Sequence, residues 1–223
     1  VESLKAHKKG LMKEAMAYCK QLIDLGYIVF AQLVAVSEYT DDDLKQLISL
    51  ANIIKPYAVS MVDTYGLLYP DKLLHIYEVL DNGLDKNITL GFHAHNNLQL
   101  AYANAISFIN YTSDRNIVVD GTLFGMGKSA GNAPIEMLGP YINSVEGKKY
   151  NIEYMLEAIE DCIKSHYAKT PWGYQTQFYL SAENNCHPNY VSFLQGKDQL
   201  SISDIDNILD SMDTDGHRRL YFD

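Results

Sequence analysis

Four short apolar runs, rich in β-branched residues, recur along the first half of the chain. They occupy residues 27–36, 57–63, 88–93 and 117–120. Their starting points lie about 30 residues apart, which is the length of one strand–helix–strand repeat. Nearly continuous apolarity over so few residues is typical of strands that are buried on both faces. The pattern therefore predicts four parallel strands.

Helical spacing of apolar residues fills the gaps between these runs. It covers residues 12–25, 40–51, 70–80 and 98–109. Thr40, which three Asp residues follow, is typical of a helix start, and Pro70 suits a first helical turn. Because strands that alternate with helices form parallel sheets, we expect an α/β fold.

After Asp120 the pattern predicts helices alone, over residues 132–142, 152–167, 176–184, 188–194 and 203–212. We therefore expect a β/α domain over residues 1–145 and a helical C-terminal extension over residues 146–223. Four parallel strands fit either an open doubly wound sheet or half of an eight-stranded barrel.

Composition narrows the class of protein. The 18 Lys and Arg residues against 28 Asp and Glu residues give a net charge of −10, which disfavours binding to nucleic acid. We expect no membrane span, because no apolar run approaches the ~20 residues that one needs. The three cysteines are far apart and form no disulfide framework, which favours a cytoplasmic protein.

Two histidines, His93 and His95, stand two positions apart at the end of the third apolar run. Side chains at positions i and i+2 of a strand share a face, so both imidazoles are expected to point beyond the carboxyl end of the sheet. Active sites of parallel α/β folds lie there, and imidazole is a common metal ligand. The alternative is a pair of structural histidines that bond to the backbone.

Polar turns follow the neighbouring runs. Asp63 and Thr64 come after the second run, where Asp63 could orient a ligand histidine and Thr64 could bind a substrate oxygen. A glycine-rich stretch, residues 121–131, follows the fourth run and could bring backbone amides close to a ligand. It is not a P-loop, because Thr122 replaces the first glycine. Simple turns with packing roles are the alternative.

Taken together, these stretches resemble the metal-dependent aldolase and lyase superfamily built on a TIM barrel. The motifs are D-T-Y-G at residues 63–66, H-A-H-N-N at 93–97 and the stretch from Val119 to Asn132. The similarity is greatest to 4-hydroxy-2-oxovalerate aldolases, with hydroxymethylglutaryl-CoA lyase and isopropylmalate synthase as more distant relatives. It spans roughly residues 12–142.

The resemblance implies the C-terminal half of the barrel, about four β/α units. In the family an Arg-Asp segment on the first strand binds substrate and metal, and nothing before Tyr27 resembles it. We therefore expect about 90 to 110 further barrel residues upstream.

The resemblance also implies a chemistry. A divalent metal, Mn or Mg, would be held by His93, His95 and the upstream Asp, and would stabilise an enolate next to a 2-oxo acid such as pyruvate. Gly125, Gly127 and Asn132 would bind substrate or lie near the metal.

Tyr190 is the candidate proton donor, although a packing role competes with that reading, and His187 is an alternative acid or base. An acyl-CoA lyase or synthase, or a non-catalytic scaffold, is the alternative function. The resemblance alone suggests an aldehyde dehydrogenase partner and allows a homo-oligomer.

Overall fold

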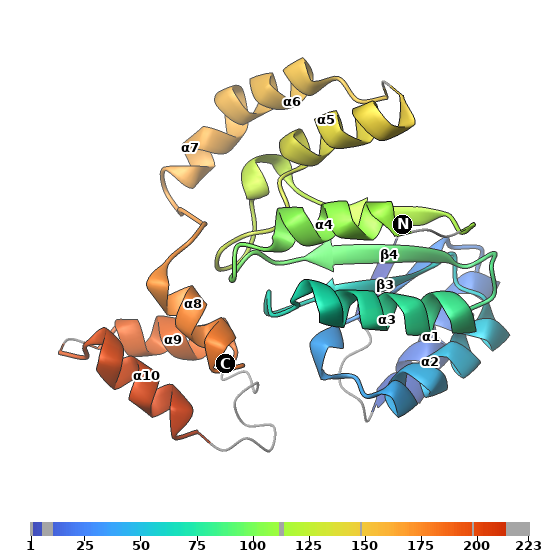
Figure 1. Cartoon of the computed structure of the whole chain (residues 1–223), viewed down its shortest axis with the longest axis horizontal. Helices are drawn as coiled ribbons and strands as arrows, with labels where there is room; N and C mark the ends of the chain where they lie inside the picture. The colour runs from blue at the N-terminus through green and yellow to red at the C-terminus, as the bar shows by residue number, and fades with distance from the viewer. Residues whose placement is uncertain (1, 6–10, 112–113, 148, 198, 213–223) are drawn as a thin grey trace. The chain divides into compact units, whose positions relative to one another are not determined.

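The computed structural model describes residues 2–5, 11–111, 114–147, 149–197 and 199–212. They form a parallel sheet, helices that follow its strands, and a run of C-terminal helices (Figure 1). The strands are β1 (Glu2–Lys5), β2 (Val29–Leu33), β3 (Ala58–Asp63), β4 (Thr89–Ala94) and β5 (Ile117–Asp120). The α-helices that alternate with them are α1 (Met12–Asp24), α2 (Asp41–Ile54), α3 (Pro70–Gly83) and α4 (Ala101–Asn110).

The chain after β5 is helical, as the sequence predicts. The short helix η3 (Leu123–Gly125) lies in the glycine-rich stretch. It is followed by α5 (Ile135–Glu146), α6 (Ile152–Ala158), the π-helical turn η4 (Ile159–Ile163), α7 (Lys164–Tyr167), α8 (Thr176–Glu183), α9 (Pro188–Gln195) and α10 (Ile202–Asp210). No helix in the described ranges is long and apolar enough to cross a membrane.

The order of the strands distinguishes the two expected architectures. All described strands run parallel, and they lie in the sheet in chain order, β1-β2-β3-β4-β5. A doubly wound sheet reverses direction at a switch point, whereas a barrel does not. The sheet therefore has the order of part of a (β/α)8 barrel. It contains one strand more than the sequence pattern predicts, because β1 lies in a short charged segment with no apolar run.

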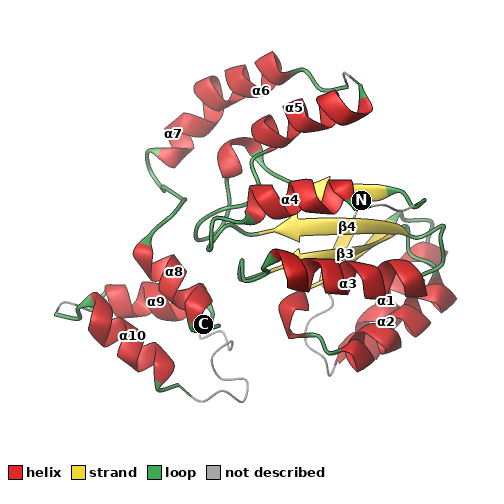
Figure 2. Ribbon diagram, viewed as in Figure 1, coloured by secondary structure: helices red, strands yellow, loops and turns green. Residues whose placement is uncertain are grey.

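The helices lie on one face of this sheet. Successive right-handed connections that always step in the same direction place each helix on the same side. Accordingly α1 packs against α2, and α2 packs against α3 (Figure 2). Phe92 of β4 contacts Phe108 of α4 with ring centroids 5.5 Å apart, and both rings are fully buried.

Side chains alternate between the two faces of each strand, so the sheet face away from the helices has a different composition. In β2 the odd positions are buried and the even positions, Phe30 and Gln32, are partly exposed. The register aligns Gln32 with Ser60 of β3, and Ser60 with Gly91 of β4. His93 lies two residues after Gly91 on the same strand, so it belongs to this face. In a barrel this face is the interior.

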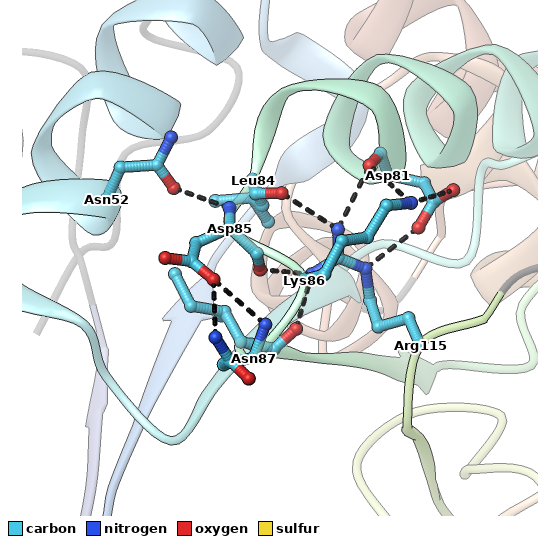
Figure 3. A network of polar contacts seen from close by, with 8 residues as sticks. Asn52, Asp81, Leu84, Asp85, Lys86, Asn87 and Arg115 are labelled. Carbon is cyan, nitrogen blue, oxygen red and sulfur yellow. Dashed lines mark hydrogen bonds and ion pairs between the residues drawn. The ribbon is translucent and has the colours of Figure 1, made fainter.

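A buried arginine stabilises the amino-terminal end of the sheet. The side chain of Arg115 has no exposed surface, and its Nε donates to the Asp81 carboxylate at 2.8 Å (Figure 3). Its other nitrogens donate to the carbonyl oxygens of Asp81, Leu84, Asp85 and Ile88. This network joins the end of α3 to the residues that precede β4 and β5. In barrels, residues at the amino-terminal end of the strands contribute to stability, whereas those at the carboxyl end form the active site.

The chain divides into two compact units, which are described separately. The first comprises the described residues of Val1–Thr64, Leu68–Ala94 and Ala103–Asp120, and it contains the sheet. The second comprises those of Tyr65–Leu67, His95–Tyr102 and Gly121–Asp223. Its last helices share a small core of their own, made of Leu180, Cys186, Val191, Ile205 and Leu209. The expected boundary between residues 145 and 146 stays a prediction.

Candidate metal and substrate site

His93 lies one residue before the end of β4, and its imidazole is paired with a carboxylate. Its Nδ1 is 3.1 Å from Oδ2 of Asp120, which is its direct partner in the register between β4 and β5. Both side chains are about one-third exposed, 29% for His93 and 37% for Asp120. A carboxylate in this position holds the proton on Nδ1, which leaves the lone pair on Nε2. Metal-binding histidines in proteins show this arrangement.

Asp120 was not among the candidate residues that the sequence indicates. The signal that could have found it is its place as the last residue of the apolar run that follows the one with His93. Carboxyl ends of neighbouring parallel strands meet at one edge of a sheet. The predicted carboxylate partner was Asp63 instead.

Asp63 and Thr64 hold the loops at the end of β3. The Asp63 side chain is buried, and its Oδ2 accepts a hydrogen bond from the Leu68 N–H at 3.0 Å. Thr64 Oγ1 accepts from the N–H of Ala35 at 2.7 Å, where Ala35 has a φ of 54°. These contacts show a structural role for both residues. A further role for Asp63 beside a histidine, or for Thr64 with substrate, stays a prediction.

His95 follows β4 directly and belongs to the second unit. It forms an isolated antiparallel bridge with Asn132, and the N–H of Asn96 donates to the Gly131 oxygen at 2.9 Å. The buried amide of Asn97 donates to the Tyr65 oxygen and accepts from the Ala130 N–H. The residues around His95 are thus tied to the glycine-rich stretch by backbone and amide contacts.

The glycine-rich stretch folds back on itself. Gly125 and Gly131 have φ values of 60° and 84°, which L side chains rarely adopt. A Cβ on Gly131 would lie 2.1 Å from the Gly125 oxygen, and that oxygen accepts the Asn132 N–H at 3.0 Å. A Cβ on Gly127 would lie 2.6 Å from Asn132 Nδ2. Close packing against the backbone therefore requires glycine at position 131. Substrate binding by Gly125 and Gly127 stays a prediction.

Asn132 has one side-chain atom that the fold does not use. Its Nδ2 donates to the Met126 oxygen at 3.0 Å. Its Oδ1 is buried and has no hydrogen-bond partner among the described residues. A buried acceptor without a partner is costly, and in native proteins such an atom often serves a ligand. Asn132 Oδ1 is thus a candidate ligand atom beside His95.

Tyr190 and His187 lie in the C-terminal helices. Tyr190 packs against the small core around Val191, and burial raises the pKa of its phenol. His187 precedes α9, where its Nδ1 accepts the Asn189 N–H at 3.1 Å. Burial, with a smaller effect of Lys128, lowers the pKa of His187 to about 4. The imidazole is therefore neutral at physiological pH. The catalytic role of Tyr190 stays a prediction.

The described residues do not gather three His, Cys, Asp or Glu side chains into a metal-binding cluster. Among the described residues, the motif offers His95 and His93, which a carboxylate holds, and the glycine-rich stretch offers the amide oxygen of Asn132. The resemblance places the remaining carboxylate ligand on the first strand of a complete barrel. These donors fit an ion that accepts nitrogen and oxygen ligands.

Proteins of related sequence carry lyase names. The chain is 29% identical over 125 residues to a 4-hydroxy-2-oxovalerate aldolase of Marinomonas sp., which covers 55% of this chain and 34% of that protein. It is 33% identical over 123 residues to an oxaloacetate decarboxylase of Mycobacterium tuberculosis, covering 55% and 35%. The chain thus spans about a third of the length of these curated relatives.

Solved structures confirm the barrel-type fold. The N-terminal domain of a putative aldolase from Bacteroides vulgatus superposes with a TM-score of 0.77 at 22% identity, covering 92% of this chain and 65% of that one. The HMG-CoA lyase of Bacillus subtilis gives a TM-score of 0.60 at 19% identity, covering 76% and 62%. Residues 2–163 match the HMGL-like family. The chain therefore belongs to the HMGL-like family, as its histidine and glycine motifs indicate.

Proposed function

We propose that the protein containing this chain is a divalent-metal-dependent lyase that breaks or forms a carbon–carbon bond next to a 2-oxo acid. The observation that carries the proposal is the pair of His93 and Asp120 at the carboxyl ends of β4 and β5. The names of the relatives, above all 4-hydroxy-2-oxovalerate aldolase, support this reaction class.

The resemblance to the family implies that His93 and His95 would hold the ion, with Asn132 near it, together with a carboxylate from the other half of a barrel. The unpartnered Asn132 Oδ1 supports the fit, because a cation would satisfy it. Nitrogen and oxygen donors with room for water and substrate favour Mn or Mg. When bound, the ion supplies Lewis acidity that stabilises negative charge on the oxygen of an enolate.

The residues of this chain would perform the other tasks. Asp120 orients the His93 ring and keeps its proton on Nδ1. Thr64 Oγ1 accepts one hydrogen bond from the backbone and can donate its own proton to a substrate oxygen. Gly125 and Gly127 let the backbone approach the substrate closely.

Tyr190 would act in proton transfer. In a retro-aldol cleavage the C3–C4 bond of a 4-hydroxy-2-oxo acid breaks, the C4 hydroxyl loses its proton and C3 gains one. Because burial raises the pKa of Tyr190, its phenol stays protonated at neutral pH, as a proton donor requires.

Product analysis with the complete protein tests the proposal. With Mn present, 4-hydroxy-2-oxovalerate should yield pyruvate and acetaldehyde in equal amounts. Cleavage of 3-hydroxy-3-methylglutaryl-CoA instead would favour the acyl-CoA alternative. Failure to cleave either compound, together with failure to bind Mn, would favour a scaffold.

A further inference from the structure

The second unit contains a cavity of about 450 Å³, and Gly127 is the one residue of its lining to which the proposed reaction gives a role. Its lining comes from the turn at Gly127–Ser129 and from residues 166 and 169–172, at the end of α7 and in the segment that leads towards α8. Ligand-binding cavities in proteins commonly measure ~300 to 1,000 Å³. This one has room for a small molecule.

The charge of the cavity is opposite to that of the chain. Lys128, His166 and Lys169 line it, and none of the described Asp and Glu residues does. The chain as a whole carries a net charge of −10. In the part of the chain that the structure describes, no carboxylate lies within ion-pair distance of the Lys169 ammonium. Two lysines and an imidazole around one cavity favour an anion as the occupant.

Hydroxyl groups add uncharged donors to the lining. Ser129 and Thr170 line the cavity beside the two lysines. A phosphate monoester carries a charge of about −1.5 to −2 near neutral pH and offers three acceptor oxygens. Two ammonium groups, an imidazole and two hydroxyls match such a group better than they match a carboxylate, which has two oxygens and one charge.

An aromatic side chain with fixed contacts also lines the cavity. Trp172 lines it, and its Nε1–H donates to the Phe124 oxygen at 2.8 Å. The indole also meets the ring of Tyr167 edge to face, with centroids 4.9 Å apart. A fixed ring surface of this kind can pack against an apolar or ring-shaped part of a ligand.

We propose that this cavity binds a small phosphate ester, with the phosphate at Lys128 and Lys169 and the organic group against Trp172. The site adjoins the candidate ligand Asn132, because Gly127 lines the cavity and lies close to the Asn132 amide. Binding there does not depend on the proposed lyase reaction, since it needs neither metal nor 2-oxo acid.

Calorimetric titration of the complete protein with phenyl phosphate, in the absence of metal, tests the proposal. We expect saturable binding at one site per chain. The double variant K128Q/K169Q should weaken it at least about tenfold, because each lysine loses a charge-assisted contact. The double variant K149Q/K164Q removes the same charge from lysines that pair with Glu146 and Glu160 outside the cavity, and it should bind as the wild type does.

Two further ligands decide what the cavity recognises. Inorganic phosphate should bind at least about tenfold more weakly than phenyl phosphate, because it lacks the group that packs on Trp172. Benzoate should also bind more weakly, because it carries one charge. Equal affinity for either ligand, absence of saturable binding, or equal weakening in both double variants would overturn the proposal.

Discussion

Nδ1 of His93 and a carboxylate oxygen of Asp120 lie 3.1 Å apart across the last pairing of β4 with β5. The pairing is a consequence of register, because the two residues are direct Cα partners at the carboxyl ends of adjacent strands. It gives a motif histidine a fixed tautomer before any ligand binds. The pairing of β4 with β5 therefore forms the sheet and also orients a side chain of the candidate site.

Replacing Asp120 by Asn should weaken metal binding without unfolding the protein. The ring of His93 loses its carboxylate partner, and such partners typically contribute about 10- to 100-fold in metal affinity. Manganese titration of the complete protein measures the change. The exposed Asp114, replaced by Asn, makes the same change of charge and should leave the dissociation constant unaltered. Equal dissociation constants for D120N and wild type would refute the role of Asp120.

The two glycines Gly131 and Gly147 offer a matched test of the glycine-rich stretch. Both have φ near 80°, but a Cβ on Gly147 meets nothing within 4 Å, whereas one on Gly131 would lie 2.1 Å from the Gly125 oxygen. Gly147→Ala should cost about 1 to 3 kcal/mol of unfolding free energy from backbone strain alone, because its φ of 82° and ψ of 157° lie in a region that is nearly confined to glycine. Gly131→Ala should cost about 3 kcal/mol or more. Urea unfolding that gives the same loss for both variants would contradict the packed loop.

Arg115 should be among the residues on which stability depends most. Its fully buried guanidinium joins the Asp81 carboxylate and four carbonyl oxygens, so Arg115→Met leaves buried acceptors without donors (Figure 3). We expect a loss of about 3 to 5 kcal/mol in chemical unfolding. Lys86→Met removes an exposed cation from the same Asp81 and should cost less than about 1 kcal/mol. Similar losses of unfolding free energy for the two variants would contradict the importance of the buried position of Arg115.

The pH dependence of stability should reveal His187. Its folded pKa, about 4, lies below the ordinary value of 6.5, so the unfolded chain binds a proton first. The contribution of His187 is complete above pH 6.5 and is lost as the pH falls towards 4; with partial solvent screening we expect about 2 kcal/mol. His187→Asn keeps an acceptor for the Asn189 N–H but cannot titrate. Unfolding free energies at pH 7.5 and 5 should differ less for this variant, and equal differences would exclude His187 as the cause.

The sequence predicts most of the fold because the four apolar runs are strands, three of them mostly buried, and the spacing of apolar residues reveals such strands. It misses β1, since residues 2–5 contain two charged side chains and only one large apolar one. The π-helical turn Ile159–Ile163 also escapes it, because apolar spacing predicts a continuous helix over that stretch. In both places the pattern of apolar and polar residues gives no signal for the element that forms.

The sequence predicts only part of the candidate site, because the rest depends on contacts between residues that are far apart in the chain. His93 and His95 are visible as a motif, but the pairing of His93 with Asp120 depends on register, which joins residues 27 positions apart. The basic cavity combines Lys128 with Lys169, and no local pattern connects them. The unpartnered Oδ1 of Asn132 is a property of the folded loop alone.

Manganese binding by the complete protein, measured for the wild type and for H93Q/H95Q with H75Q as the control, tests the central claim most directly. His75 is exposed and pairs with Asp41, far along the chain from the motif. The wild type and H75Q should bind one ion per chain and cleave 4-hydroxy-2-oxovalerate only when it is present, whereas H93Q/H95Q should bind at least about 100-fold more weakly and show no turnover. Undiminished manganese affinity in H93Q/H95Q, or full turnover by wild-type protein stripped of metal, would contradict the account.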